Sequence, residues 1–201
     1  MRLAFCLLAA LSSTTSSAAD PVVESPRAIP LAYDTDVVVL GGTTGAVAAA
    51  CEASAHGARV VLLAPRPYLG DDLCATLRLW LEDGEQPESK LAADCFGARR
   101  LATPLAVKAA MDRALLASGV SCLTGCYVTD VLRDGQQRPA GVVMVNRSGR
   151  QAVRAKVIVD ATSHATAARQ AGAAFRPFSP GPQDFTRVVV GGPVRQGPRI
   201  V

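Results

Sequence analysis

The chain has 201 residues, of which 49% are hydrophobic and 19% are charged. This composition excludes an intrinsically disordered chain and is that of a globular protein long enough for one domain with a substantial core. The net charge of +4 is small, the basic residues are scattered and only 4% of residues are aromatic, so no nucleic-acid-binding groove, which needs clustered Lys and Arg beside stacking rings, is predicted.

The first 19 residues have the pattern of a secretory signal peptide. Arg2 supplies the positive charge, and residues 3–11 form an apolar stretch that is too short to cross a bilayer. Ser17 and Ala19 are the small residues that a cleavage site before Asp20 requires. We therefore expect export to the periplasm or the extracellular space and no membrane span in the mature chain. The alternatives are an uncleaved membrane anchor or an incorrectly assigned start codon.

The next segments predict the start of a nucleotide-binding fold. Residues 20–33 contain three prolines and are expected to form an extended lead-in. The apolar run 36–40 is typical of a strand buried on both faces. It is followed by glycines, an alanine-rich helix over 43–56 and a second buried strand over 58–64. A strand, turn, helix and strand in this order form a βαβ unit, which winds into a parallel sheet.

The middle of the chain predicts helices and one more strand. A short helix is expected over residues 73–81, and the polar segment after it reads as a loop. Thr103 and Pro104 have the pattern of a helix start, with a capping residue followed by proline at the first position. This helix is expected to end at Gly119, and a short strand follows it.

The last part predicts an antiparallel β-meander. Three apolar strands over residues 127–160 are separated by the turn sequences DGQQ and RSGR. The third strand contains a buried run, 155–160, which we expect to rejoin the parallel sheet, and a short helix is expected over 164–172. The predicted fold is therefore α/β and Rossmann-like, with a parallel sheet plus a three-stranded antiparallel meander. The domain is expected to span residues 34–192, with a tail at 193–201.

Cysteine spacing predicts no metal site. Five cysteines remain after removal of the signal peptide, and none forms a CxxC or Cys/His pattern for zinc or an iron–sulfur cluster. An odd number of cysteines leaves at least one thiol unpaired within the chain. Cys122 and Cys126 are expected to face the same side of a strand, too far apart to form a disulfide.

The glycine turn after the first strand indicates a dinucleotide site. In such a turn the first glycine makes the bend, the second lets the backbone approach a pyrophosphate, and the third lets helix and strand pack closely. Gly41 takes the first role, Thr43 stands at the second position, and Ala46 suits the third. N–H groups at the helix start would hold the phosphates, and the Thr43 hydroxyl is expected to donate a further hydrogen bond. The alternative is a plain βαβ crossover that binds no ligand.

The end of the second strand departs from the dinucleotide pattern. An acidic residue normally stands there and holds the ribose hydroxyls, but this chain has Ala64. Arg66, two residues on, is expected near the adenosine or a phosphate. The alternative for Arg66 is a solvated loop cation.

Four segments in the same order resemble FAD-dependent oxidoreductases of the two-dinucleotide-binding-fold type, which are related to the flavin domain of the heterodisulfide reductase A subunit. The segments are DVVVLGGTTGAVAAA, RPYLGDDLCATLRLWL, GCYVTDVLRDG with the meander, and KVIVDATSHATAARQAGA. The resemblance covers residues 34–192 and implies FAD as the cofactor. It also implies a chain that is truncated before the substrate domain. The glycine of the last turn is replaced by Ser163. His164 beside it is expected to help start a helix, and the alternative is an approach to the cofactor.

The resemblance also implies which residues contact FAD. Gly41, Gly42, Thr43, Thr44, Gly45 and Ala46 would line the pyrophosphate, Pro65 and Arg66 the adenosine ribose, Gly70 and Asp71 the path to the flavin, Val128 the adenine, and Ala161 and Thr162 the end of the last strand. The expected function is that of an exported FAD-dependent oxidoreductase acting on an unknown small-molecule substrate, with no catalytic residue predicted. The alternative is a catalytically inactive nucleotide-binding fragment, or a subunit that needs a partner chain to complete its fold.

Overall fold

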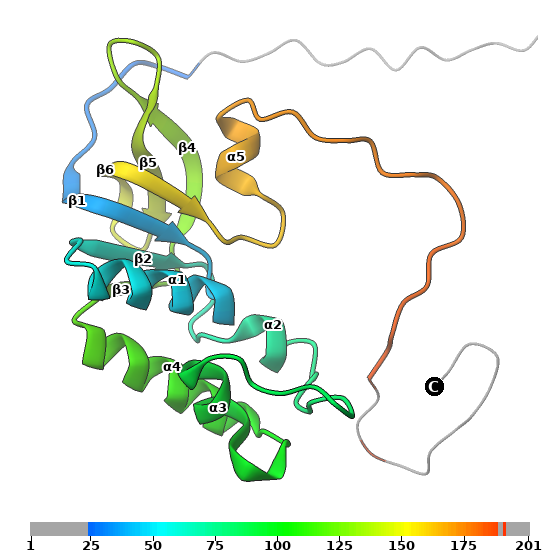
Figure 1. The fold of residues 1–201 in the computed structure, drawn as a ribbon. Coiled ribbons are helices and arrows are strands. Elements are labelled where there is room, and N and C mark those ends of the chain that lie inside the picture. The colour runs from blue at the N-terminus through cyan, green and yellow to red at the C-terminus, as the bar shows by residue number, and fades with distance from the viewer. Residues whose placement is uncertain (1–23, 189–190, 192–201) are drawn as a thin grey trace, which may run out of the picture.

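A computed structural model describes residues 24–188 and residue 191. The predicted signal peptide and the tail at 193–201 lie outside these residues. Within the described residues, six strands form one sheet (Figure 1). The strands are β1 (Leu31–Leu40), β2 (Val60–Ala64), β3 (Ser121–Thr124), β4 (Tyr127–Arg133), β5 (Pro139–Asn146) and β6 (Gly149–Asp160). The helices are α1 (Thr44–Ala55), α2 (Asp71–Cys74), α3 (Lys90–Phe96), the 3-10 turn η1 (Gly97–Arg99), α4 (Pro104–Ser118) and α5 (Thr166–Gln170).

The sheet combines the two predicted parts in one layer. Its strand order is β3-β2-β1-β6-β5-β4. The first four of these strands are mutually parallel, whereas β6, β5 and β4 are paired antiparallel. The long strand β6 therefore belongs to both parts, because it pairs with β1 on one edge and with β5 on the other. The predicted α/β fold with a parallel sheet and a three-stranded meander is confirmed.

Two apolar layers cover the two faces of the sheet. On one face, α1, α3 and α4 pack over inward-facing residues such as Val39 and Leu62. On the other face, Val38 and Leu40 share a cluster with side chains of β4, β5 and α5. Figure 1 shows α5 on the opposite side of the sheet from α1 and α4. Successive side chains of a strand point to opposite faces, so a strand between two layers must be apolar throughout. In the described part of the chain, no helix has both the length and the apolar character needed to cross a bilayer.

The two long helices begin and end where the sequence predicts. Thr43 caps α1 and Thr103 caps α4, each by accepting a hydrogen bond from the N–H three residues on. Gly119 ends α4 with a φ of +67°, a left-handed conformation that glycine adopts without steric cost. The alanine side chains of α1 are small, so this helix lies close to both the sheet and α4. The Ser54 hydroxyl donates to the Ser118 carbonyl at 2.7 Å and ties the two helices together.

Three elements differ from the sequence predictions. β1 begins at Leu31, five residues earlier than expected, because the end of the proline-rich lead-in pairs with β6. The helix expected over 73–81 is reduced to α2, since Leu77 has a φ of +59° and Trp80 forms a bridge to Leu101 instead. Helix α3 was not predicted, although Ser89 caps it by accepting from the Ala92 N–H.

The cysteine prediction is partly wrong. The described cysteines are all unpaired thiols. Cys122 packs against the helix-covered face of the sheet, whereas Cys126 is buried on the meander face. Gly125, between them, has a φ of +66° and ends the regular alternation of the strand. The two thiols therefore lie on opposite faces.

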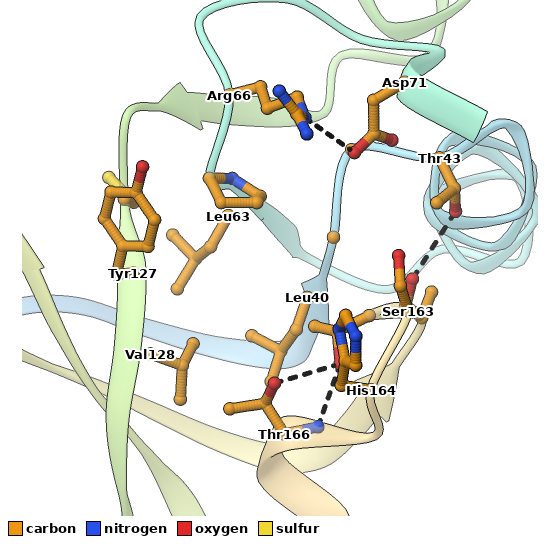
Figure 2. Close-up of a pocket in the computed structure, with 16 residues that line it drawn as sticks. Leu40, Thr43, Leu63, Arg66, Asp71, Tyr127, Val128, Ser163, His164 and Thr166 are labelled. Carbon is orange, nitrogen blue, oxygen red and sulfur yellow. Dashed lines mark hydrogen bonds and ion pairs between the residues drawn. The ribbon is translucent and has the colours of Figure 1, made fainter. Parts of the chain in front are cut away.

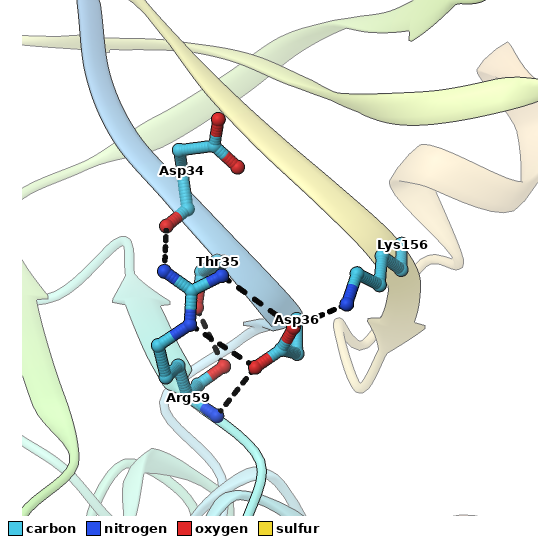
Figure 3. Close-up of polar contacts among 5 residues, drawn as sticks. All are labelled: Asp34, Thr35, Asp36, Arg59 and Lys156. Carbon is cyan, nitrogen blue, oxygen red and sulfur yellow. Dashed lines mark hydrogen bonds and ion pairs between the residues drawn. The ribbon is translucent and has the colours of Figure 1, made fainter.

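A network of charges ties the middle of β1 to β6 and to the residue that precedes β2 (Figure 3). The Asp36 carboxylate accepts from the backbone N–H and the side chain of Arg59 at 3.0 and 3.2 Å, and it pairs with Lys156 at 2.8 Å. Thr35, which is buried, donates its hydroxyl to the Arg59 carbonyl at 2.5 Å. The network joins β1 to β6 and to the start of β2, and Asp36 lies five residues before Gly41 of the glycine turn.

Because of this network, the stability of the fold is expected to vary with pH in the acid range. Hydrogen bonds from Lys156, then from the Arg59 N–H and side chain, hold the pKa of Asp36 well below its ordinary value. A carboxyl with a depressed folded-state pKa stabilises the fold above its unfolded pKa of about 3.9, and this stabilisation is lost as the pH falls further. We expect the free energy of unfolding to fall between pH 5 and pH 2, and to fall less steeply in Asp36→Asn. Denaturant titrations at constant ionic strength measure both slopes, and parallel pH profiles would contradict the prediction.

Candidate cofactor site

A cavity of about 400 Å³ lies at the carboxyl ends of the central parallel strands (Figure 2). Its walls come from the residues that follow β1, β2 and β6, and from the start of β4. β1 lies between β2 and β6 in the sheet, so the chain leaves neighbouring strands in opposite directions at this point. Ligands of open α/β sheets bind at such a switch point, and the volume suits a small-molecule site.

Most of the residues predicted to contact the cofactor line this cavity. They are Gly41, Gly42, Thr43, Pro65, Arg66, Asp71, Val128, Ala161 and Thr162. The remaining predicted residues do not line it. Thr44 and Gly45 border a separate, smaller cavity, which is also lined by residues of α3. Ala46 is fully buried in the core, and Gly70 is buried as well. His164, for which an approach to the cofactor was only the less favoured alternative, also lines the cavity. The other lining residues were not predicted to belong to the site. They are Leu40, Leu63, Cys126, Tyr127, Ser163 and Thr166.

Gly41 makes the bend that opens the cavity. Its φ is +121°, and a Cβ at this position would lie 2.5 Å from the Ala161 carbonyl oxygen. Its N–H donates to the Leu63 carbonyl at 2.9 Å. The backbones that follow β1, β2 and β6 therefore meet at a point where no side chain fits.

Thr43 stands in the middle of the turn without closing it. Its hydroxyl accepts from the Ala46 N–H at 3.1 Å and lies 3.5 Å from the Ala161 carbonyl oxygen, to which it donates. The hydroxyl is thus engaged within the protein, and donation to a phosphate would require it to leave the Ala161 carbonyl oxygen. Among the hydrogen bonds of the described residues, none uses the N–H of Gly42 or of Thr43. Both residues line the cavity, so these two amides are available to an anion.

The carboxylates of Asp71 and Asp72 lie beside the glycine turn. The Asp72 carboxylate accepts from the Thr44 N–H at 2.9 Å and from the Thr44 hydroxyl at 2.5 Å, so it occupies the first amide of α1. The Asp71 carboxylate lies 3.5 Å from the Arg66 guanidinium. Its Oδ1 is buried without a hydrogen-bond partner. No acidic residue on β2 therefore takes the place of the ribose-binding acid that was expected at Ala64. The acidic groups near the glycine turn come from α2 instead.

Ala64 and Gly70 both contact Gly42 of the glycine turn. Ala64 is fully buried, and its Cβ would lie 3.4 Å from a Cβ placed on Gly42. Gly70 donates its N–H to the Gly42 carbonyl at 2.7 Å, which fixes α2 against the glycine turn. A larger residue at position 64 would press on this contact, so the small alanine has a packing role here.

Asp160 organises the turn that forms the opposite wall. One carboxylate oxygen accepts from the Thr162 hydroxyl at 2.6 Å and the Thr162 N–H at 3.1 Å, and the other accepts from the Ala168 N–H at 2.9 Å. Burial raises the pKa of Asp160, but the hydrogen bonds outweigh burial and hold the pKa below its ordinary value. The ionised carboxylate therefore joins the end of β6 to α5.

Replacing Asp160 should weaken both the fold and the site. Because hydrogen bonds to a charged group contribute about 1.5–3 kcal/mol, we expect Asp160→Asn to lower the free energy of unfolding by about 2 kcal/mol. We also expect weaker FAD binding, since Thr162 lines the cavity. Asp134→Asn is the control, because Asp134 accepts hydrogen bonds in the β4–β5 turn and does not line the cavity. Equal losses of FAD affinity in both variants would contradict the proposed role of Asp160.

The features of the cavity suit the ADP half of FAD. Backbone amides, small residues and one arginine lie where a diphosphate would bind, at the switch point of the sheet. The orphaned oxygen of Asp71 is an acceptor, so a ribose hydroxyl would satisfy it and a phosphate oxygen would not. The volume and the unused amides therefore fit the ADP half of the cofactor, while the carboxylates of α2 offset part of the positive potential.

Comparisons with known proteins agree with this geometry. A search of curated protein sequences found no match. Among solved structures, Thermovibrio ammonificans THI4 aligns with 22% identity and a TM-score of 0.54 over 68% of this chain and 61% of that one. A geranylgeranyl bacteriochlorophyll reductase-like protein from Thermoplasma acidophilum aligns with 16% identity and a TM-score of 0.51 over 70% of this chain and 42% of that one. These likenesses establish the fold, and the chain spans less than two thirds of either structure's length.

The family comparison is more specific. The model of the family described as FAD dependent oxidoreductase matches residues 36–177. The match runs from β1 through α5, and so includes every segment that lines the cavity. The cofactor of this family is FAD. The chain belongs to the FAD-dependent oxidoreductase family.

Proposed function

We propose that this chain holds FAD in the cavity through the ADP half of the cofactor, and that it serves oxidation or reduction of a small-molecule substrate. The observation that carries the proposal is the pair of unused N–H groups on Gly42 and Thr43, which line a cavity at the switch point of the sheet. The diphosphate would accept from these amides, and Arg66 would lie beside it. When bound, FAD supplies electron and hydride transfer at its isoalloxazine ring.

The remaining proposed contacts follow from the walls of the cavity. Pro65 and Arg66, after β2, would border the adenosine ribose, and Val128, on β4, would lie against the adenine. Ala161 and Thr162 would border the diphosphate from the end of β6. The chain's own residues thus bind and orient the cofactor, and none of them is assigned a step in the reaction.

The proposal is tested by flavin retention. Purified chain is mixed with FAD or with FMN and passed through a desalting column, and the flavin absorbance that elutes with the protein is measured. We expect FAD to be retained, FMN to be lost because it lacks the adenosine and one of the two phosphates, and excess ADP to displace FAD. Equal retention of FAD and FMN would contradict binding through the ADP half, and loss of both from a folded chain would favour a non-catalytic or partner-dependent role.

We further propose that the chain is exported and loses residues 1–19. The sequence pattern supports this proposal, and the segment lies outside the described residues. Amino-terminal sequencing of the chain recovered from a secreting bacterial host should find Asp20 as the first residue. Ala19→Asp should block cleavage, and an uncleaved wild-type chain in the cytosolic fraction would contradict export.

A further inference from the structure

We propose that His164 is a positioning residue for the diphosphate of FAD, and that protonation of its imidazole strengthens FAD binding. The inference rests on the proposed function, because it concerns the same cavity. It follows from the charges around the cavity, from the placement of His164, and from the small number of histidines in the chain.

The arginine of the cavity is already paired. The Nε of Arg66 lies 3.5 Å from an oxygen of Asp71, and the Asp71 side chain is only 15% exposed. Because the two charges cancel, this side of the cavity presents little net positive potential to a diphosphate. Arg66 must share its charge between Asp71 and the ligand.

The positive potential at the amino terminus of α1 is also partly neutralised by a carboxylate. A helix amino terminus attracts anions through its unpaired N–H groups and its dipole. Here the Asp72 carboxylate accepts from both the N–H and the hydroxyl of Thr44. The chain's own carboxylate thus takes part of the potential that a dinucleotide site ordinarily offers its diphosphate.

His164 is the other basic residue that lines the cavity, and it approaches from the far wall. Figure 2 shows the Arg66–Asp71 pair at one end of the view and His164 beside Leu40 and Thr166 at the other. Among the hydrogen bonds and ion pairs of the described residues, none engages its imidazole, and the residue is exposed. Its ring therefore keeps its hydrogen-bonding capacity for a ligand.

The turn that carries His164 is fixed by its backbone. The His164 carbonyl accepts from the Arg169 side chain at 2.8 Å, and the Thr166 N–H donates to the Thr162 hydroxyl at 2.9 Å. Ala165 has a φ of +50°, in the left-handed region, which separates His164 from the course of α5. The imidazole is thus presented by a defined turn at the end of β6.

Other titratable and charged groups face this region and must be considered. They are Asp160 and Arg169 on the segments next to His164, Arg66 and Asp71 from the far wall, and Cys126 and Tyr127 at the start of β4. An ordinary carboxyl is ionised throughout the range from pH 5.5 to pH 8, and arginine and tyrosine keep their charge state there. The diphosphate of FAD is a diester and keeps its negative charges throughout the same range. Histidine is the side chain whose ordinary pKa, about 6.5, falls within it.

The chain offers a matched control, because it contains only two histidines. The second, His56, caps the far end of α1, has a side chain that is 76% exposed and does not line the cavity. Variants at the two positions therefore separate an effect at the cavity from a general effect of histidine charge.

The test is FAD affinity as a function of pH, measured by flavin fluorescence at constant low ionic strength. We expect wild type and His56→Gln to bind FAD about two- to fivefold more tightly at pH 5.5 than at pH 8, as for an exposed charge pair. His164→Gln should bind weakly with no such slope. His164→Arg should bind tightly at both values, because its guanidinium stays charged.

The outcomes distinguish this inference from the function on which it rests. If FAD binds and His164→Gln keeps the slope of wild type, the inference is overturned while the proposed function stands. If wild type binds FAD with equal affinity at both pH values, the inference is also overturned. If no variant binds FAD at any pH, the proposed function itself is overturned, and the inference with it.

Discussion

Gly41→Ala is expected to lower the free energy of unfolding by about 3 kcal/mol or more, because a left-handed backbone and a steric clash add their costs. The new Cβ would lie 2.5 Å from the Ala161 carbonyl oxygen and 2.9 Å from its carbon. These are backbone atoms at the junction of two paired strands, so they cannot move aside as a flexible side chain can. The variant should also retain no FAD, because any shift at this point displaces the turn that lines the cavity.

Gly57→Ala is the matched control for this variant. Gly57 also has a positive φ, +82°, but a Cβ there would meet nothing within 4 Å. Its substitution should therefore cost only the backbone strain, about 1–2 kcal/mol, and FAD retention should stay intact. Chemical denaturation of both variants measures the difference. Equal losses of stability would show that the close approach of Gly41 to Ala161 is not a constraint on the fold.

Gly70→Ala is expected to have the second largest effect, lowering the free energy of unfolding by about 2–4 kcal/mol. Gly70 has a φ of +76°, and a Cβ there would lie 2.6 Å from a methyl carbon of Val107 on α4. The same residue donates its N–H to Gly42, so a shift of α2 would also disturb the glycine turn. We therefore expect weaker FAD retention together with the loss of stability, measured on the same preparations.

A second substitution tests the cause of this effect. Val107→Ala removes the methyl groups that a Cβ at Gly70 would meet, so it should recover part of the lost stability in the Gly70→Ala background. Measured alone, it should cost stability, because Val107 is fully buried. A coupling energy of about 1–2 kcal/mol in the double-mutant cycle is expected for residues in contact. Additive effects would contradict the steric explanation. Gly84→Ala, at an uncrowded position with a positive φ, serves as the strain control.

Much of the fold could be predicted because its signals are local. The continuous apolar run of β1 indicates a strand covered on both faces, and Thr103 with Pro104 marks the start of α4. The elements that were missed depend on tertiary contacts. The expected helix ends after α2 because Leu77 has a left-handed backbone and Trp80 forms a bridge to Leu101. Neither feature could be predicted from a periodic pattern in the sequence.

The site was predictable where the chain itself brings residues together. The glycine turn, Pro65 with Arg66, and Ala161 with Thr162 all follow the ends of parallel strands, and such ends meet at one edge of a sheet. The carboxylate of Asp72 reaches Thr44 from 28 positions away in the sequence, through the path of α2. That contact, and the role proposed for His164, can be inferred only from the three-dimensional arrangement of charges.

The most direct test of the central claim is the response of two backbone amides to the cofactor. In an isotope-labelled chain titrated with FAD, the amide resonances of Gly42 and Thr43 should shift strongly, with the same midpoint as flavin binding. The amide resonances of Gly57 and Gly149, which lie outside the cavity, should stay in place. Saturable FAD binding that leaves the resonances of Gly42 and Thr43 unmoved would show that the diphosphate is not held at this turn.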